Sequence, residues 1–239
     1  MPDYGLIIKN DSGGILIDST YRNLSLDQSG TSESISNDNT SGGAYTRIAI
    51  TPSPLVPIVL IRPNTDYFVN VRNYYKSGSN FTGVDIVTER SQSTGIDWQS
   101  YRENRTASGD DYGLLVYNSS GDLCFDSGKN YFRIVSITES IILDDPPVGY
   151  ANGDYQDVTH TGISDPYYIL TPSSYWLRGE YNPAPPSITS FALWMIGIKK
   201  LSSTSVRVGW FCFGSYGIGG DVHENAGNNP TMKLLVCKP

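Results

Sequence analysis

Two histidines, His160 and His223, are the side chains of this sequence best suited to proton transfer or metal binding near neutral pH. They lie far apart in polar stretches, and neither has a second histidine or a cysteine at the spacing of a metal-binding motif. No Gly-x-Ser-x-Gly sequence marks a serine nucleophile, although the members of a Ser-His-Asp triad need not be close in the chain. The sequence therefore predicts no metal site and no catalytic residue, and we expect the protein not to be an enzyme.

Acidic pairs and a glycine-rich run offer the remaining chemistry. Asp144-Asp145, or Asp154 with Asp157, could act as the two carboxylates of a glycoside hydrolase, but acids in a loop are more often solvated or bind a cation. The glycine-rich run 214–220 is followed by an acidic loop rather than by the helix that a phosphate site needs. We therefore interpret it as a connection, and we expect no cofactor.

A polar segment at residues 146–166 is the better lead, because Tyr150, Tyr155 and His160 lie there among Asn, Gly and Asp. Tyrosine with small polar neighbours is typical of adaptable recognition surfaces. Trp98 and Trp176 are further aromatic residues that could stack on sugar rings, and these five are the predicted contacts with a receptor or partner. An ordinary polar crossover is the alternative interpretation of the segment.

The overall charge and hydropathy exclude several classes of partner. The net charge is −7 at pH 7, and the 17 basic residues are scattered, whereas nucleic-acid binding depends on clustered Lys and Arg. No apolar window approaches the length of a membrane span, and the first residues do not have the pattern of a secretory signal. We expect neither nucleic-acid binding nor membrane insertion.

Three cysteines, Cys124, Cys212 and Cys237, form no Cys-x-x-Cys pair and lie in apolar runs. Buried, reduced, structural thiols are the favoured interpretation over a disulfide or a metal site. The odd number of cysteines and the missing signal favour folding in a reducing cytoplasm.

The elements that carry these residues are predicted to be strands, and one unit of them occurs twice. Residues 3–19 read as an apolar run, a polar turn with glycine and a second apolar run, which is typical of a β-hairpin. The segment recurs at residues 111–127 without a gap, and nine of the 22 positions from Asp3 to Leu24 are identical after a shift of 108. Chance predicts about one or two identities. We expect Gly13 and Gly121 to shape the turns.

The Asp-Ser pairs that end both copies, Asp18-Ser19 and Asp126-Ser127, have two interpretations. Short polar side chains commonly bind neighbouring backbone groups at such positions. A catalytic role is the alternative, but no histidine follows at a matching place in each copy. The structural interpretation is favoured.

The whole chain is predicted to be all-β, because short strands alternate with frequent Gly and Pro turns and no long helical pattern occurs. We expect antiparallel β-sandwiches in two domains, 1–109 and 110–239, each opening with one of the related hairpins. A single larger sandwich is the alternative. Strands are expected at 45–51, 56–62, 67–75, 84–89, 133–137, 141–143, 167–170, 175–178, 190–201, 205–213 and 231–237.

Two long loops and one weak region complete the prediction. Residues 27–43 are almost entirely Ser, Asn, Asp, Thr and Gly, which predicts a mobile loop. Residues 146–166 form the second long loop, in the C-terminal domain. Residues 78–109 are interpreted as one short strand and a connecting loop, and the proline-interrupted strands before them as edge strands.

The second hairpin also carries a resemblance. Its sequence from Asp111 to Gly128 resembles a segment of small tail-associated proteins of tailed bacteriophages, with the pattern Gly-Leu-x-Val-x-Asn-x-x-Gly-x-x-x-Phe-Asp-Ser. A weaker similarity extends over residues 206–237, so the resemblance covers about a quarter of the chain. The first copy departs from the pattern, with Lys9 and Ile17 in place of Tyr117 and Phe125.

The resemblance implies a virion structural protein of the tail tip, fibre or fibre-attachment apparatus, without catalytic residues. Its expected partners are other phage tail proteins, further copies of the same chain, and a host-surface glycan or protein. Its expected location is the virion tail, after folding in the host cytoplasm. A carbohydrate- or receptor-binding module and a capsid decoration protein are the alternative functions.

Overall fold

The computed structural model describes residues 7–9, 15–18, 23–34, 36–37, 43–64, 66–89, 92–144, 154–171, 175–183, 186–217 and 231–238. Within these residues every regular element is a β-strand, and all strand pairs are antiparallel. The predicted all-β, sandwich-like class is confirmed.

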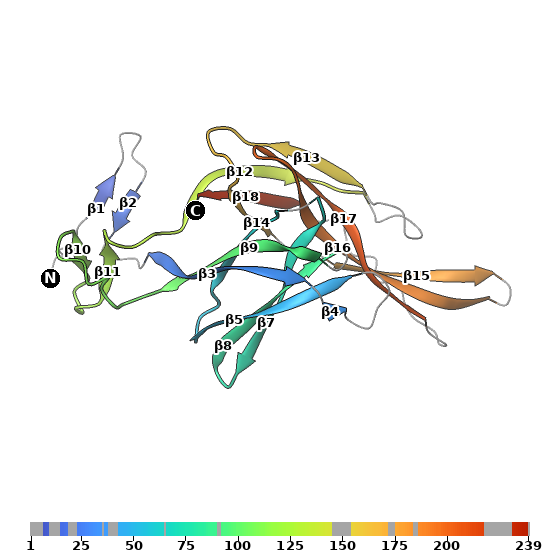
Figure 1. Cartoon of the computed structure of the whole chain (residues 1–239), viewed down its shortest axis with the longest axis horizontal. Coiled ribbons are helices and arrows are strands. Elements are labelled where there is room, and N and C mark those ends of the chain that lie inside the picture. Colours follow the sequence, from blue (N-terminus) through green and yellow to red (C-terminus); the bar gives the residue numbers. More distant parts are fainter. Residues whose placement is uncertain are drawn as a thin grey trace.

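Two sheets form the body of the molecule (Figure 1). The six-stranded sheet has the order β12 (Arg133–Ile141), β18 (Met232–Lys238), β14 (Tyr167–Thr171), β6 (Ile58–Arg62), β9 (Gln92–Glu103) and β3 (Leu24–Ser34). The eight-stranded sheet has the order β13 (Tyr155–Thr159), β17 (Ser205–Gly217), β16 (Pro186–Ser202), β7 (Val69–Ser77), β8 (Asn80–Thr88), β5 (Ala44–Ser53) and β4 (Ser36–Asn37), with β15 (Tyr175–Pro183) paired to β16.

The core lies between the two sheets, and the period-two patterns explain why. On β18, Met232, Leu234 and Val236 are fully buried, while Lys233 between them is exposed. Within strand β16, residues 193–198 are all apolar and all buried, because both faces of the strand are covered there. Its Trp194, Ile196 and Ile198 side chains belong to the inter-sheet core, whereas Leu193 and Met195 belong to a second cluster with Phe68, Phe211 and Phe213.

The expectation of two separate sandwiches divided near residue 109 is wrong for the described strands. Strands β3, β6 and β9 come from the first half of the chain and share one sheet with β12, β14 and β18 from the second half. Strand β7 likewise pairs with β16 in the other sheet, through Val69 and Ile198. The two halves therefore build one sandwich, as the alternative interpretation held.

Several predicted loops are strands. Residues 27–34 of the expected mobile loop belong to β3, which pairs with β9 from Leu24–Glu103 to Ser34–Gln92, and β4 follows it. Region 78–109 contains β8 and β9 in place of one short strand, and segment 146–166 contains β13. Strand β6 lies between β14 and β9, so it is not an edge strand despite its flanking prolines. These strands were not predicted because their sequences are largely polar. Main-chain pairing does not require apolar side chains, so polar segments can still form strands.

The repeated unit forms two separate hairpins, β1 (Ile7–Lys9) with β2 (Ile15–Asp18) and β10 (Leu115–Tyr117) with β11 (Leu123–Asp126). Both lie at one end of the molecule, the left in Figure 1, outside the two large sheets. Their registers agree at every paired position, and the same bulge follows Ile8 and its counterpart Val116. The predicted duplication is thus also a duplication of backbone geometry.

Candidate functional site

The five predicted contact residues do not form one exposed surface. Trp98 is only 8% exposed and belongs to the core between the sheets. Its Nε1 donates a hydrogen bond to Ser32 Oγ over 3.0 Å, and Gly30 lies directly over its ring. The prediction that Trp98 stacks on a sugar is therefore wrong, because β3 covers the ring.

His160 is also interior, with 5% of its surface exposed. Its Nε2 lies 2.8 Å from the Tyr168 hydroxyl, and its backbone N–H donates to the Thr204 carbonyl over 3.0 Å. Burial lowers the pKa of His160 below its ordinary value, against smaller opposing effects of the Ile163 backbone and of Asp165. A direct receptor contact by His160 is thus ruled out in this fold; it fastens the segment after β13 to the sandwich.

Tyr155 is the predicted contact that does reach the surface, with 49% exposure. The Arg207 guanidinium lies 3.6 Å from the centre of its ring, and Asp157 accepts two hydrogen bonds from Arg207, over 2.7 and 3.0 Å. Those bonds lower the pKa of Asp157 despite partial burial. Strand pairing of β13 with β17 places the three side chains together, so an aromatic ring and a charged pair share one exposed site.

The other two predicted contacts cannot be placed in a site. Tyr150 lies outside the described residues. Trp176 occupies a position on β15 opposite Trp194, but its side chain also falls outside the described part of the structure.

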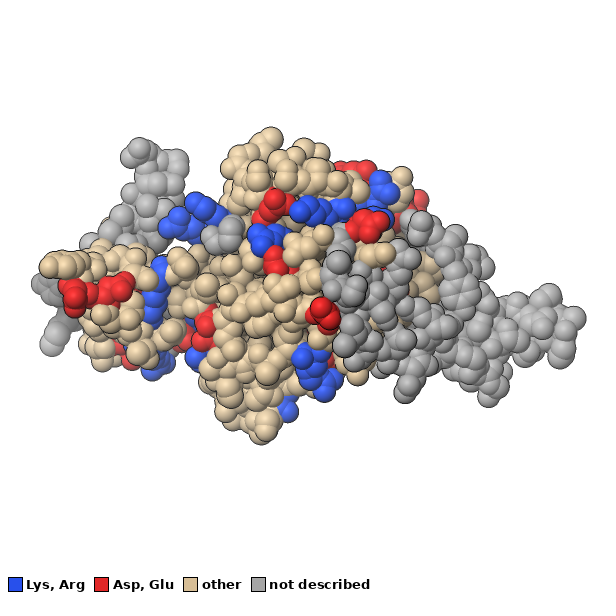
Figure 2. Space-filling model, in the orientation of Figure 1, with Lys and Arg blue, Asp and Glu red and all other residues tan. Residues whose placement is uncertain are grey.

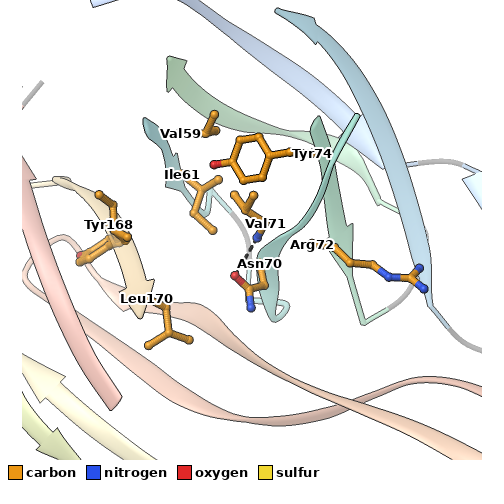
Figure 3. Close-up of a pocket in the computed structure, with 9 residues that line it drawn as sticks. Val59, Ile61, Asn70, Val71, Arg72, Tyr74, Tyr168 and Leu170 are labelled. Carbon is orange, nitrogen blue, oxygen red and sulfur yellow. Dashed lines mark hydrogen bonds between the residues drawn. The ribbon is translucent and has the colours of Figure 1, made fainter. Parts of the chain in front are cut away.

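A pocket of about 100 Å³ opens between β6, β7 and β14 (Figure 3). Val59, Ile61 and Tyr74 gather on one side of it, and Arg72 points away from them. Asn70 makes two internal bonds: its Nδ2 donates to the Ile196 carbonyl over 2.6 Å and its Oδ1 accepts from the Val71 amide over 2.7 Å. Ligand sites are usually about 300 Å³ or larger, so we interpret this pocket as a gap in inter-sheet packing.

Two residues that the repeat keeps identical, Asp126 and Ser127, fasten the base of the second hairpin to its own flanking segments. The Asp126 carboxylate, 2% exposed, accepts hydrogen bonds from the Ser108 amide and hydroxyl and from the Gly128 amide, over 2.6, 3.1 and 2.9 Å. Burial acts to raise the pKa of Asp126, but these bonds outweigh it and the pKa is lowered. The Ser127 hydroxyl accepts from the Leu114 amide over 2.8 Å. The structural interpretation of this Asp-Ser pair is confirmed.

The turn of the hairpin is fixed in the same way. Asn118 Oδ1 accepts from the Ser120 and Asp122 amides over 3.0 and 2.8 Å. Gly121 has a φ of 81°, a conformation that a side chain disfavours, as predicted from the repeat. Below the hairpin, Phe125 stacks on Tyr131 with ring centres 4.9 Å apart. The hairpin is therefore a defined unit with its own fastening.

Strand β10 and the residues just before it present apolar side chains to solvent. Val116 is buried at 6%, but Tyr112, Leu114, Leu115 and Tyr117 are 93%, 42%, 43% and 50% exposed. We call these four residues the hairpin surface. Their signal in the sequence is an apolar run in a hairpin too small to cover both of its faces. The apolar run predicted a strand, but its exposure to solvent was not predicted.

Charge is distributed without a dominant patch on the face shown in Figure 2, where basic side chains lie interspersed with acidic ones. Cys124, Cys212 and Cys237 form no disulfide with one another; Cys124 and Cys237 are buried as predicted, and Cys212 is partly buried. No helix of the described chain is long and apolar enough to cross a membrane. Among the described residues no cluster of three metal-ligating side chains occurs.

No family model, curated protein or solved structure matches this chain.

Proposed function

We propose that this chain is a non-catalytic structural protein of a bacteriophage tail, in the tail tip, fibre or fibre attachment, and that it acts by protein–protein assembly. The hairpin surface carries the proposal. It combines exposed apolar side chains with a rigidly fastened backbone, and exposed apolar patches commonly mark protein interfaces. The sequence of this same hairpin resembles phage tail proteins.

The rigid fastening favours assembly over chance exposure. Three hydrogen bonds to the Asp126 carboxylate and two between Ser127 and Leu114 hold the base of the hairpin. A surface that is ordered before binding loses little conformational entropy when a partner docks. In this proposal the partners are other tail proteins and further copies of the chain, and the protein reaches the virion tail after folding in the host cytoplasm.

The test uses two tyrosines of nearly equal exposure, Tyr117 in the hairpin surface at 50% and Tyr155 on β13 at 49%. Virions that carry Tyr117→Ser should lose the protein from the tail, whereas virions with Tyr155→Ser should retain it. Gold-labelled antibody and cross-linking with mass spectrometry locate the chain in each particle. Finding the wild-type chain only on the head would favour a capsid decoration protein. Finding the wild-type chain in no virion would overturn the proposal.

A carbohydrate- or receptor-binding module is the second candidate, favoured by the exposed group of Tyr155, Asp157 and Arg207. Exposed aromatic rings and paired polar groups are suited to sugar recognition. Here Tyr155→Ala should abolish binding on a glycan array, and Tyr117→Ser should leave it unchanged. A correctly folded chain without signal on any glycan would exclude this function.

A further inference from the structure

Strand β12 forms one border of the six-stranded sheet and pairs only with β18 among the described strands (Figure 1). Its first five residues, Arg133 to Ile137, are all exposed. Three of them are apolar: Ile134, Val135 and Ile137 have exposures of 44%, 44% and 48%. Further along, Ile141 enters the core and is fully buried. Among the described residues, the exposed part of β12 thus combines a strand edge without a neighbouring strand and apolar side chains.

An edge of this kind is a template for pairing with another strand. We propose that β12 pairs with β12 of a second copy of this chain, antiparallel across a two-fold axis, so that two six-stranded sheets become one continuous sheet. The proposal deepens the assembly role proposed above and rests on it only for its biological setting. It concerns a surface separate from the hairpin surface.

Symmetry restricts the register of such a pair. Opposite residues in antiparallel strands alternate between hydrogen-bonded and non-hydrogen-bonded pairs. A two-fold axis relates each residue pair on one side to an equivalent pair on the other side, and equivalent pairs must be of the same type. Because successive pairs alternate in type, the axis passes midway between one residue and the same residue of the second copy. Centring on Val135 would place Arg133 opposite Ile137, and centring on Ile134 would place it opposite Val135.

Centring on Ser136 gives complementary pairs throughout. Val135 then lies opposite Ile137, Ile134 opposite Thr138, and Arg133 opposite strand position 139, which is a glutamate in the sequence. Each pair occurs twice by symmetry. Apolar positions lie opposite apolar positions or a threonine, and a basic position lies opposite an acidic one, which are the combinations that stabilise cross-strand pairs. This charge complementarity identifies a second copy as the partner.

A cysteine placed at the axis tests the register directly. In an antiparallel sheet, opposite Cα atoms are about 4.5 to 5.5 Å apart, within the range that a disulfide spans. Under mild oxidation Ser136→Cys should give a disulfide-linked dimer of the full chain. Thr138→Cys is the matched control, because position 138 lies opposite Ile134 and not opposite itself. The wild-type chain controls for its three native cysteines.

Charge reversal tests the same register without a covalent bond. Arg133→Glu and Glu139→Lys should each place like charges opposite each other twice, and should weaken the dimer on the order of ten-fold. The double variant restores opposite charges and should recover wild-type affinity. Light scattering coupled to size-exclusion chromatography, over a range of concentrations, measures the dimer, and circular dichroism verifies that each variant is folded.

Two outcomes would overturn the inference. A wild-type chain that stays monomeric at every concentration would show that the bulges of β12, between Ile134 and Ser136 and between Thr138 and Ile141, protect this edge from pairing. Equal cross-linking at positions 136 and 138, or a double variant as weak as the single ones, would exclude this register. Either result leaves the tail role intact, since that role is tested by the location of the chain in virions.

Discussion

The two borders of the six-stranded sheet, β3 and β12, differ in what they present to water. Strand β3 is rich in Ser, Thr and Gly, and it lies against β9 over almost its whole length. Strand β12 presents Ile134, Val135 and Ile137 instead. The comparison teaches that polarity decides whether an edge strand can remain in solvent, and not whether the segment forms a strand at all.

Strand β3 has few apolar side chains of its own, and side chains of strands β9 and β6 stabilise it. Gly30 and Ser32 contact the Trp98 ring, and the Thr31 hydroxyl donates to Asp97 Oδ1 over 2.6 Å. Asp97 also forms an ion pair with Arg62 of β6. Side chains of β9 therefore hold the polar strand β3 in place. In contrast, the apolar side chains in the first part of β12 are exposed and lie outside the core.

Replacing Trp98 should break the polar edge. Trp98→Ala removes a core ring and the bond to Ser32, and should lower the free energy of unfolding by about 3 to 5 kcal/mol. Urea denaturation measures this loss, and hydrogen exchange should show that β3 amides lose protection first. Leu55→Ala, at a site 56% exposed, is the control and should cost about 0.5 kcal/mol or less. A small loss with β3 still protected would mean that main-chain pairing alone holds this edge.

Acid should weaken the same edge through Asp97. Burial acts to raise the pKa of Asp97, but hydrogen bonds from Thr31 and Arg62 outweigh it and the pKa is lowered. A carboxyl whose pKa is lowered by folding stabilises the fold fully at a pH above its unfolded-state pKa, which is near 3.9. That contribution is lost as the pH falls through the folded-state pKa. Asp97→Asn should therefore cost about 1 to 3 kcal/mol at pH 7 and much less in strong acid.

Unfolding of both proteins at neutral and acidic pH measures that difference. Asp157→Asn is the control, because the Asp157 side chain is 46% exposed and its pair with Arg207 should contribute less. A constant difference between wild type and Asp97→Asn at all pH values would contradict a role for ionised Asp97.

Adding one carbon to β3 should have a smaller effect. A Cβ at position 30 would lie 3.0 Å from Trp98 Cζ2, so Gly30→Ala requires the ring or the strand to shift. We expect a loss of about 1 kcal/mol in urea denaturation. Ser29→Ala, at an exposed neighbouring position, should change stability by about 0.5 kcal/mol or less. Equal effects of the two substitutions would remove the close approach as an explanation.

A polar substitution on β12 should have the smallest effect on stability. Ile137→Thr at a concentration where the chain is monomeric should change the free energy of unfolding by about 0.5 kcal/mol or less, because the side chain is 48% exposed. Its effect should appear instead in self-association. A loss above about 2 kcal/mol in the monomer would place Ile137 among the core residues and end the contrast between the two edges.

Sequence patterns predicted those elements whose signals are local. The hairpin at β10 and β11 followed from its apolar runs and turn residues, and Gly121 has the expected positive φ. Strands β14, β16, β17 and β18 matched predicted apolar runs to within a few residues. In each case the residues whose pattern predicts the element also make the contacts that stabilise it. One short stretch of sequence is therefore enough to predict the element.

Features that depend on distant partners were not predictable in this way. Strand β3 exists because β9 pairs with it, from Ser34 with Gln92, 58 positions apart, to Leu24 with Glu103, 79 positions apart. Its own polar residues suggested a loop. The repeat suggested two domains, but pairs such as Tyr168 with Ile61 join the halves in one sheet. Trp98 and His160 were expected at the surface because their neighbours in sequence are polar, and their actual neighbours come from β3 and β14.

The position of β18 has a consequence for how the chain reaches this fold. Strand β18 follows every other strand of the six-stranded sheet in the chain, yet it lies between β12 and β14 and pairs with both. The six-stranded sheet therefore cannot be completed until this strand has left the ribosome. High sequence separation between contacting strands slows folding and prolongs exposure of unpaired edges. A nascent chain lacking β18 would present β12 and β14 to chaperones as open strands.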